Sequence, residues 1–278
     1  MIKDYTRVDV APEGVDDLAF VEAVWSAKLG DKVGAGELDL SNRDEYRVMA
    51  PFLAGIPAGV SILDGGCGAG DWTVFLQQRG YAVIGLDISE RLISRLRERW
   101  PKCTWIRGDL RATGLPADSV DVYFSWGAIE HFEEGLSPCL DEAARILRPG
   151  GLLCVSVPYA NRRHLRAHGA REGELVDPGP KPGTRFYQWR VGRSELAEAL
   201  RCAKLTVLDV VPIHLEEGVR RLLFHHSWKW LAGPNPAGAA VRRLLCRIIP
   251  LDYAAHMVMG VARKPGGNGQ PRASGGES

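Results

Sequence analysis

A cluster of glycines behind a short apolar run is the segment whose residue types best suit ligand binding. The sequence VSILD at 60–64 is followed by GGCGAGDW at 65–72. The apolar run before the glycines indicates a buried strand, and residues 71–79 indicate a helix. Glycine lets the backbone turn sharply and approach a ligand closely, and a helix N-terminus offers unpaired N–H groups. We therefore expect this loop to hold a polar or anionic ligand group.

The spacing of the glycines distinguishes two kinds of nucleotide-binding loop. A dinucleotide-binding loop has the pattern G-x-G-x-x-G. Counted from Gly66 and Gly68, its third glycine would fall at Asp71. The glycine instead comes one residue earlier, at Gly70, which gives D-x-G-x-G-x-G from Asp64. This pattern resembles the first motif of the class I methyltransferases that use S-adenosylmethionine.

Acidic residues at the next two strand ends agree with this resemblance. Asp87 ends the strand predicted at 82–87, and a carboxylate there can accept two hydrogen bonds from a ribose diol. Asp109 ends the strand predicted at 103–109. The resemblance implies that Asp109 receives the adenine amino group.

Three later segments carry the resemblance further. Residues 125–132, SWGAIEHF, look like the motif that lies under the methionine part of the cofactor, and residues 145–158 resemble the segment that follows it. Residues 256–265 are similar to the family's antiparallel seventh strand. The resemblance is close over 42–160 and loose over 193–264. It implies S-adenosylmethionine as cofactor, bound by Asp64, Gly65, Gly66, Cys67, Gly68, Asp87, Ile88, Gly108, Asp109, Leu110, Ser125, Trp126 and Gly127.

Alternating strands and helices must position these residues. Near-continuous apolar strands predict a parallel sheet covered on both faces. The predicted class is α/β, a doubly wound, mostly parallel seven-stranded sheet with an antiparallel last strand, as in the Rossmann-like methyltransferase fold. Strands are predicted at 60–64, 82–87, 103–109, 120–126, 151–158, 204–211 and 255–263. Helices are predicted at 71–79, 89–99 with Ser89 as N-cap, 136–147, and 195–203 with Ser194 as N-cap.

The segments outside this pattern define the domain organisation. Residues 1–57 are predicted to be a mostly helical N-terminal cap, 58–264 the methyltransferase domain, and the Gly-rich tail 265–278 disordered. An insertion at about 159–192, rich in Gly and Pro, is expected to be a mobile cover over the acceptor site. A second, at 214–254, should form two helices around GPNPAG. Its apolar stripe, bordered by Arg and Lys, either packs on the core or contacts a membrane surface or a lipid-linked acceptor.

The acceptor side of the site is harder to predict. His131 follows a strand end on the cofactor side and is a candidate for both acceptor binding and general-base catalysis. Glu130 and Tyr159 are other candidates for the base. Tyr159, Tyr187 and Trp189 are candidates for acceptor binding, although Tyr187 and Trp189 could equally anchor their loop to the core. A base is needed only if the nucleophile arrives protonated, since alignment alone supplies much of the catalysis.

Composition limits the classes of partner. The net charge of +1 and the lack of a nucleic-acid-binding motif argue against nucleic acid. The six cysteines form no C-x-x-C pair and have no His at ligand spacing, which predicts no metal site and suits the cytoplasm. The start of the sequence does not resemble a signal peptide, and no apolar run reaches the ~18 residues of a membrane span.

The sequence therefore predicts methyl transfer from S-adenosylmethionine to a small or a lipid- or saccharide-linked acceptor. One alternative is a nicotinamide-dependent oxidoreductase, against which the displaced third glycine counts. Another is a non-catalytic scaffold that binds the cofactor on a methyltransferase fold, since fold alone does not fix function.

Overall fold

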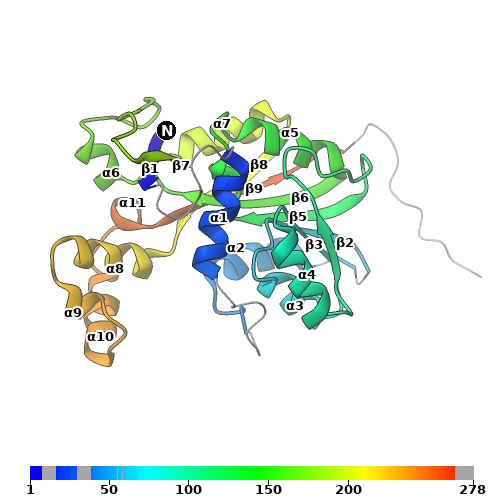
Figure 1. Cartoon of the computed structure of the whole chain (residues 1–278), viewed down its shortest axis with the longest axis horizontal. Helices are drawn as coiled ribbons and strands as arrows, with labels where there is room; N and C mark the ends of the chain where they lie inside the picture. Colours follow the sequence, from blue (N-terminus) through cyan, green and yellow to red (C-terminus); the bar gives the residue numbers. More distant parts are fainter. Residues whose placement is uncertain (8–16, 30–38, 55, 58, 267–278) are drawn as a thin grey trace, which may run out of the picture.

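A twisted β-sheet forms the centre of the computed structural model, which describes residues 1–7, 17–29, 39–54, 56–57 and 59–266 (Figure 1). Among these residues, seven strands lie in the order β4-β3-β2-β5-β6-β9-β8. Strands β2 to β6 are parallel, and β9 is antiparallel to both of its neighbours. The predicted fold class is confirmed. The strands are β2 (Ser61–Gly65), β3 (Ala82–Asp87), β4 (Thr104–Arg107), β5 (Val120–Trp126), β6 (Leu147–Pro158), β8 (Thr206–Ile213) and β9 (Met257–Arg263).

Helices cover both faces of the sheet because the side chains of each strand alternate between the faces. In β5, Tyr123 belongs to the apolar cluster beneath α5 (Ser137–Ile146) and α7 (Arg193–Cys202). Val122 and Phe124 belong to the opposite cluster, with α2 (Asp44–Leu53) and α3 (Asp71–Gln77). Helix α4 (Glu90–Arg99) packs near the β4 edge against Trp105, and Ser89 caps it as predicted, accepting a hydrogen bond from the Leu92 N–H at 3.3 Å.

The N-terminal segment differs from the prediction. Residues 2–7 are not helical: β1 (Ile2–Arg7) pairs antiparallel with β7 (Thr184–Arg190) in a second, two-stranded sheet. Ile2 is fully buried, and Arg190 forms an ion pair with Asp4 at 2.7 Å. Helix α1 (Asp17–Leu29) follows, as predicted. The predictions for residues 8–16, 30–38 and 267–278 fall outside the described residues.

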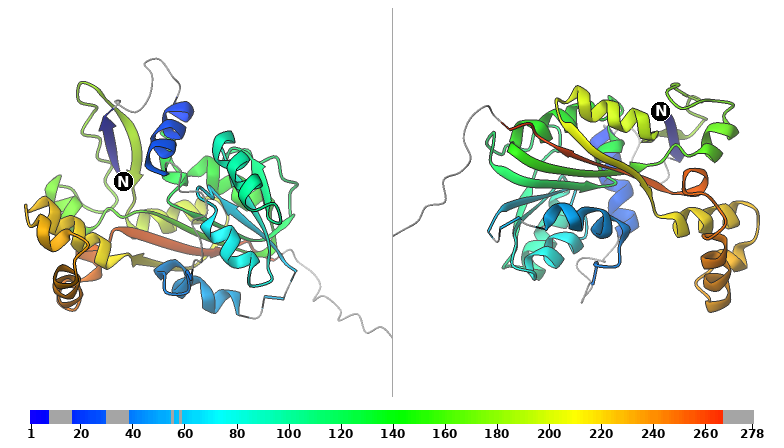
Figure 2. Two further views of the ribbon diagram at one scale, coloured as in Figure 1. Left: turned by 60° about the horizontal axis from the view of Figure 1, so that its bottom comes forward. Right: turned by 180° about the vertical axis from the view of Figure 1, so that it is seen from behind.

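The two insertions contain regular structure. The first holds α6 (Arg162–Ala167) and β7. Helix α7 begins after Gly192, whose N–H donates to Glu195, while the Ser194 hydroxyl donates to Glu172, so the predicted Ser194 cap is wrong. The second insertion forms an arm that extends from the sheet (Figure 2). The arm consists of α8 (Leu215–His225), α9 (Lys229–Ala232), α10 (Pro236–Leu245) and α11 (Leu251–Ala254).

The turn between β2 and α3 requires glycine at specific positions. Gly66 and Gly70 have φ values of +74° and +79°, which L-residues with a side chain rarely adopt. A Cβ atom on Gly66 would lie 2.5 Å from the Cβ of Ala128, and one on Gly70 would lie 2.6 Å from the side chains of Leu96 and Trp105. The glycines therefore let the backbone turn sharply between two packed elements.

Alanine substitutions can separate the two reasons for glycine at position 70. Gly70→Ala should lower the free energy of unfolding by about 2–4 kcal/mol, from a strained φ and a clash with packed side chains. Gly80→Ala is the matched control, because Gly80 also has a positive φ, +87°, but has open space where a Cβ atom would lie. Gly80→Ala should lower the free energy of unfolding, measured by urea denaturation, by only about 1–2 kcal/mol. Equal losses would show that packing around position 70 has no part in the requirement.

Candidate functional site

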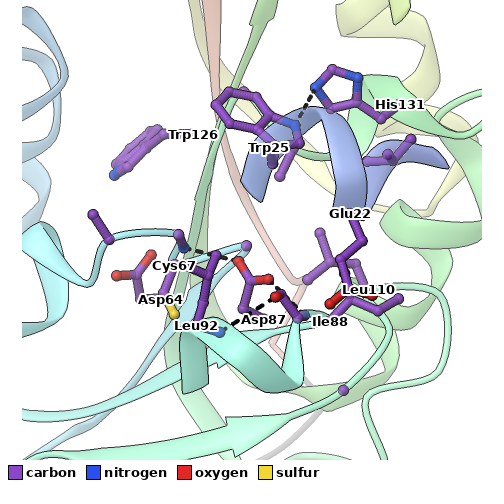
Figure 3. Close-up of a pocket in the computed structure, with 18 of the residues that line it drawn as sticks. Glu22, Trp25, Asp64, Cys67, Asp87, Ile88, Leu92, Leu110, Trp126 and His131 are labelled. Atoms are coloured by element: carbon purple, nitrogen blue, oxygen red, sulfur yellow. Dashed lines mark hydrogen bonds between the residues drawn. The ribbon is translucent and has the colours of Figure 1, made fainter. Parts of the chain in front are cut away.

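A cavity of about 290 Å³ lies at the carboxyl ends of β2, β3 and β5, with α1 on its outer side (Figure 3). This is the edge where open α/β sheets bind ligands. The glycine turn forms part of its wall. The lining residues are Val21, Glu22, Trp25, Asp64, Gly66, Cys67, Gly68, Ala69, Asp71, Trp72, Asp87, Ile88, Ser89, Leu92, Gly108, Leu110, Trp126, Gly127, Ala128, His131 and Phe132.

Most residues that the sequence assigned to the cofactor line this cavity. Three do not. Gly65 lies against the Tyr123 ring with no room for a side chain, and Ser125 is fully buried in β5. The Asp109 carboxylate accepts hydrogen bonds from the Arg111 backbone N–H at 2.8 Å and from its guanidinium, Nε at 3.1 Å and Nη2 at 2.8 Å. The predicted residues that do line the cavity are Asp64, Gly66, Cys67, Gly68, Asp87, Ile88, Gly108, Leu110, Trp126 and Gly127.

Among the residues assigned to the acceptor, His131 lines the cavity. The Tyr187 ring lies beside it, with 4.8 Å between the ring centroids. Tyr159 and Trp189 are buried elsewhere. Their polar atoms donate to Asp252 at 3.3 Å and to the Phe132 carbonyl at 3.1 Å, respectively. The structure thus brings His131 and Tyr187 together, but of these four residues only His131 lines the cavity.

Two carboxylates at the ends of neighbouring strands hold the loop. Asp87 accepts hydrogen bonds from the backbone N–H of Gly68 at 2.9 Å and of Ser89 at 3.0 Å. Asp64 accepts one from the Thr73 hydroxyl at 2.7 Å. Burial raises the pKa of Asp64 to about 7. Burial also raises the pKa of Asp87, and the backbone hydrogen bonds oppose that rise.

The cavity lining is acidic. It includes Glu22, Asp64, Asp71 and Asp87, and none of the lining residues is Lys or Arg. Glu22 belongs to α1, and its charge contributes to raising the pKa of Asp87. Four carboxyl groups around a partly apolar cavity favour a ligand with positive charge, because an anion would meet like charges at short range.

Helix α1 supplies wall residues that the sequence reasoning missed. Val21, Glu22 and Trp25 line the cavity, whereas Val24 is buried away from it. The sequence predicted a mostly helical N-terminal segment, but not that this helix lies against the cavity. A signal in the sequence was the acidic Glu22, which lies one helical turn from Trp25 on the face of α1 that lines the cavity.

The contacts of His131 define its tautomer. Its Nδ1 lies 2.6 Å from the Tyr187 carbonyl oxygen, which can only accept, so Nδ1 carries the proton. The Trp25 indole N–H donates to Nε2 at 3.3 Å, so Nε2 presents its lone pair (Figure 3). In this arrangement Nε2 faces Trp25, and the buried Glu130 carboxylate lies 3.9 Å from it.

Comparisons with known proteins show which proteins this chain is similar to. A family model described as a methyltransferase domain matches residues 62–151. A probable S-adenosylmethionine-dependent methyltransferase of Mycolicibacterium smegmatis is 31% identical over 66% of this chain and 66% of its own length. A trans-aconitate 2-methyltransferase of an Azoarcus strain is 34% identical over 41% of this chain and 46% of its own length. The chain thus spans about two thirds or less of these relatives.

Solved structures share the fold at low sequence identity. The [4+2]-cyclase SpnF matches with a TM-score of 0.59 and 19% identity, covering 91% of this chain and 98% of that one. An S-adenosylmethionine-dependent methyltransferase of Mesorhizobium loti matches with a TM-score of 0.53 and 22% identity, covering 81% of this chain and 100% of that one. These likenesses support the fold alone.

The sheet order, the glycine turn and the acidic residues at the strand ends define an α/β protein with a site for a nucleoside-containing cofactor. Together with the family model and the relatives, they identify the family. The chain belongs to the class I S-adenosylmethionine-dependent methyltransferases, and its cofactor is S-adenosylmethionine.

The assigned tautomer of His131 can be measured. Long-range ¹H–¹⁵N spectra of the histidine rings should show a protonated Nδ1 and a bare Nε2 at His131. The exposed His225 and His226 should instead show the mixture of tautomers expected in water. In Trp25→Phe the Nε2 resonance should shift, because the indole donor is lost. An Nε2–H tautomer at His131 in the unaltered protein would contradict the assignment.

Proposed function

We propose that this protein transfers the methyl group of S-adenosylmethionine to a small or a lipid- or saccharide-linked acceptor. The acidic lining of the cavity carries the proposal. The cofactor bears a sulfonium and an ammonium group against one carboxylate, so its net charge is positive and complements Glu22, Asp64, Asp71 and Asp87. When bound, it supplies an electrophilic methyl carbon on that sulfonium.

The site residues fit the parts of this cofactor. Asp87 uses one lone pair on each oxygen for the backbone and keeps others for a ribose diol. The buried Asp64 can stabilise an ammonium group, and the glycine turn leaves the backbone open to close approach. We assign no cofactor contact to Asp109, because Arg111 occupies its carboxylate and it does not line the cavity.

The same lining argues against the nicotinamide alternative. A dinucleotide would bring a pyrophosphate, with two negative charges, among four carboxyl groups, and no lining Lys or Arg would offset them. Isothermal titration should therefore detect S-adenosylmethionine and not NAD. Tight binding of NAD, with none of S-adenosylmethionine, would overturn the proposal.

The acceptor side of the site contains Trp25, His131 and Phe132. We propose that the acceptor binds there and that His131 Nε2 takes its proton once Trp25 moves aside. The names of two relatives support a small or carrier-linked acceptor: the trans-aconitate 2-methyltransferase and a malonyl-[acyl-carrier protein] O-methyltransferase of Pectobacterium atrosepticum, 34% identical over 37% of this chain and 41% of its own length. A cytoplasmic location is part of the proposal, in keeping with the free cysteines.

Turnover distinguishes an enzyme from a cofactor-binding scaffold. The assay would measure S-adenosylhomocysteine formed with trans-aconitate, malonyl-acyl-carrier protein, and lipid and saccharide extracts as acceptors. Transfer to any of them, reduced in His131→Ala without loss of cofactor binding, is the expected result. Cofactor binding without transfer to any of these acceptors would favour the scaffold.

Loss of the Asp87 carboxylate should weaken cofactor binding. Asp87→Ala is expected to lower the affinity for S-adenosylmethionine by about 1–3 kcal/mol in isothermal titration, because a charged acceptor for the ribose is lost. Asp109→Ala is the matched control at the next strand end, and should leave the affinity nearly unchanged. Equal effects would mean that Asp109 also binds the cofactor.

The raised pKa of Asp64 predicts a pH dependence. Because burial raises that pKa to about 7, the free site gains a proton as the pH falls below 7. A cationic ligand favours the ionised carboxyl, so affinity should fall up to about tenfold per pH unit between about pH 7 and 5.5, where the cofactor's ammonium stays protonated. Asp64→Asn should flatten this slope and the half-buried Asp71→Asn should keep it. A slope unchanged in Asp64→Asn would assign the titration to another group.

A further inference from the structure

The arm formed by α8 to α11 has an apolar core of its own. Val219, Leu223, Ala232 and Ala254 are buried together in a cluster separate from those of the sheet. The buried Arg242 braces the arm by donating to the carbonyls of Leu231 at 2.7 Å and Gly233 at 3.0 Å. The stripe predicted at 214–254 thus packs partly within the arm. That packing accounts for only part of its apolar side chains.

Large apolar side chains remain outside this core. All residues from 224 to 230, FHHSWKW, are exposed, with 60% of Trp228 and 66% of Trp230 accessible. Leu244 near the end of α10, Ile248 in the turn after it and Leu251 at the start of α11 are exposed as well. Packing on the sheet therefore does not explain these side chains, and an exposed group of this kind marks an interaction surface.

The basic residues of the arm fall into two groups. Arg220 and Arg221 pair with Glu217, and Arg242 pairs with Glu216. Lys229, Arg243 and Arg247 have no acidic partner within 4.0 Å among the described residues. They are the cations next to the exposed apolar side chains: Lys229 lies between Trp228 and Trp230, Arg243 precedes Leu244, and Arg247 precedes Ile248.

We propose that this arm binds the surface of bilayers that contain anionic lipids. Tryptophan rings favour the level of the headgroups, and aliphatic side chains favour the boundary below them. Lys229, Arg243 and Arg247 complement lipid phosphates, since each basic residue near an anionic membrane strengthens binding. A second copy of this chain would bring the same positive charges face to face, so the bilayer is the better complement. No helix in the described ranges is long and apolar enough to cross a membrane.

The arm is attached at the edge of the sheet that holds the cavity. It joins the end of β8 to the start of β9, and β8 runs parallel to β6, so both connections lie at the carboxyl ends of the parallel strands. The His214 N–H donates to Asp44 at 2.8 Å, and its ring pairs with Glu45 at 3.0 Å, which ties the arm to α2. A bound bilayer would therefore lie beside the edge where the cavity is found.

Vesicle binding tests the proposal in the full chain, without cofactor or acceptor. Phosphatidylcholine vesicles with about one third phosphatidylglycerol should co-sediment the protein at low salt, and pure phosphatidylcholine vesicles should do so weakly. Trp228→Ala/Trp230→Ala and, separately, Arg243→Glu/Arg247→Glu should each lower partitioning about tenfold or more. Arg99→Glu/Lys102→Glu is the matched charge control on exposed residues at the opposite edge of the sheet, and should retain most of the binding.

Cofactor affinity measured on each variant reports whether it is folded, because the substituted residues lie outside the cavity lining. Failure of the folded protein to bind the anionic vesicles would overturn the proposal. So would binding that is equal in all variants. A concentration-dependent dimer in sedimentation velocity, abolished by Trp228→Ala/Trp230→Ala, would assign the surface to a second copy instead. Vesicle binding without methyl transfer would support the proposal and leave it independent of the proposed reaction.

Discussion

Two neighbouring carboxylates beside a glycine turn, Asp64 buried and Asp87 half-buried, are the constraint on which the site depends. Asp64 and Asp87 lie at the carboxyl ends of neighbouring parallel strands, and the charge of Asp87 contributes to raising the pKa of Asp64. Burying a carboxylate is costly unless it is hydrogen-bonded. The N–H groups of Gly68 and Ser89 stabilise Asp87, and the Thr73 hydroxyl stabilises Asp64. The loop conformation and the acid pair therefore require one another.

This arrangement leaves a residual negative potential that α1 increases. Hydrogen bonds only partly offset burial at Asp64, whose pKa stays near 7, and Glu22 adds a further acid from outside the sheet. Repulsion among the carboxylates makes the empty site electrostatically unfavourable, and a bound cation reduces this repulsion. The same helix brings the Trp25 N–H to His131, so α1 both lines the cavity and contacts the imidazole.

The sequence predicted the sheet well, because the parallel strands are rich in buried apolar residues and a Gly, Asp or Pro lies at or directly after the end of each. Contacts between distant segments were not predictable. The pairing of β1 with β7 joins residues more than 170 positions apart, and no local pattern in Ile2–Arg7 names its partner. The sequence also did not predict that the backbone folds back at Asp109, so that Arg111, two residues on, reaches its carboxylate.

In the arm, the amphipathic sequence pattern alone does not distinguish packing on a protein core from contact with a membrane. A helix that packs on a core and a helix that lies on a bilayer both need an apolar stripe bordered by charge. The two kinds of helix differ in whether other parts of the protein already cover the apolar stripe. In this chain it is divided: Val219 and Leu223 are covered within the arm, while Trp228 and Trp230 remain exposed. Because the inner set alone forms the arm's core, the outer set is free to contact a surface without disturbing the cavity. The proposed membrane contact and the cavity thus involve separate residues.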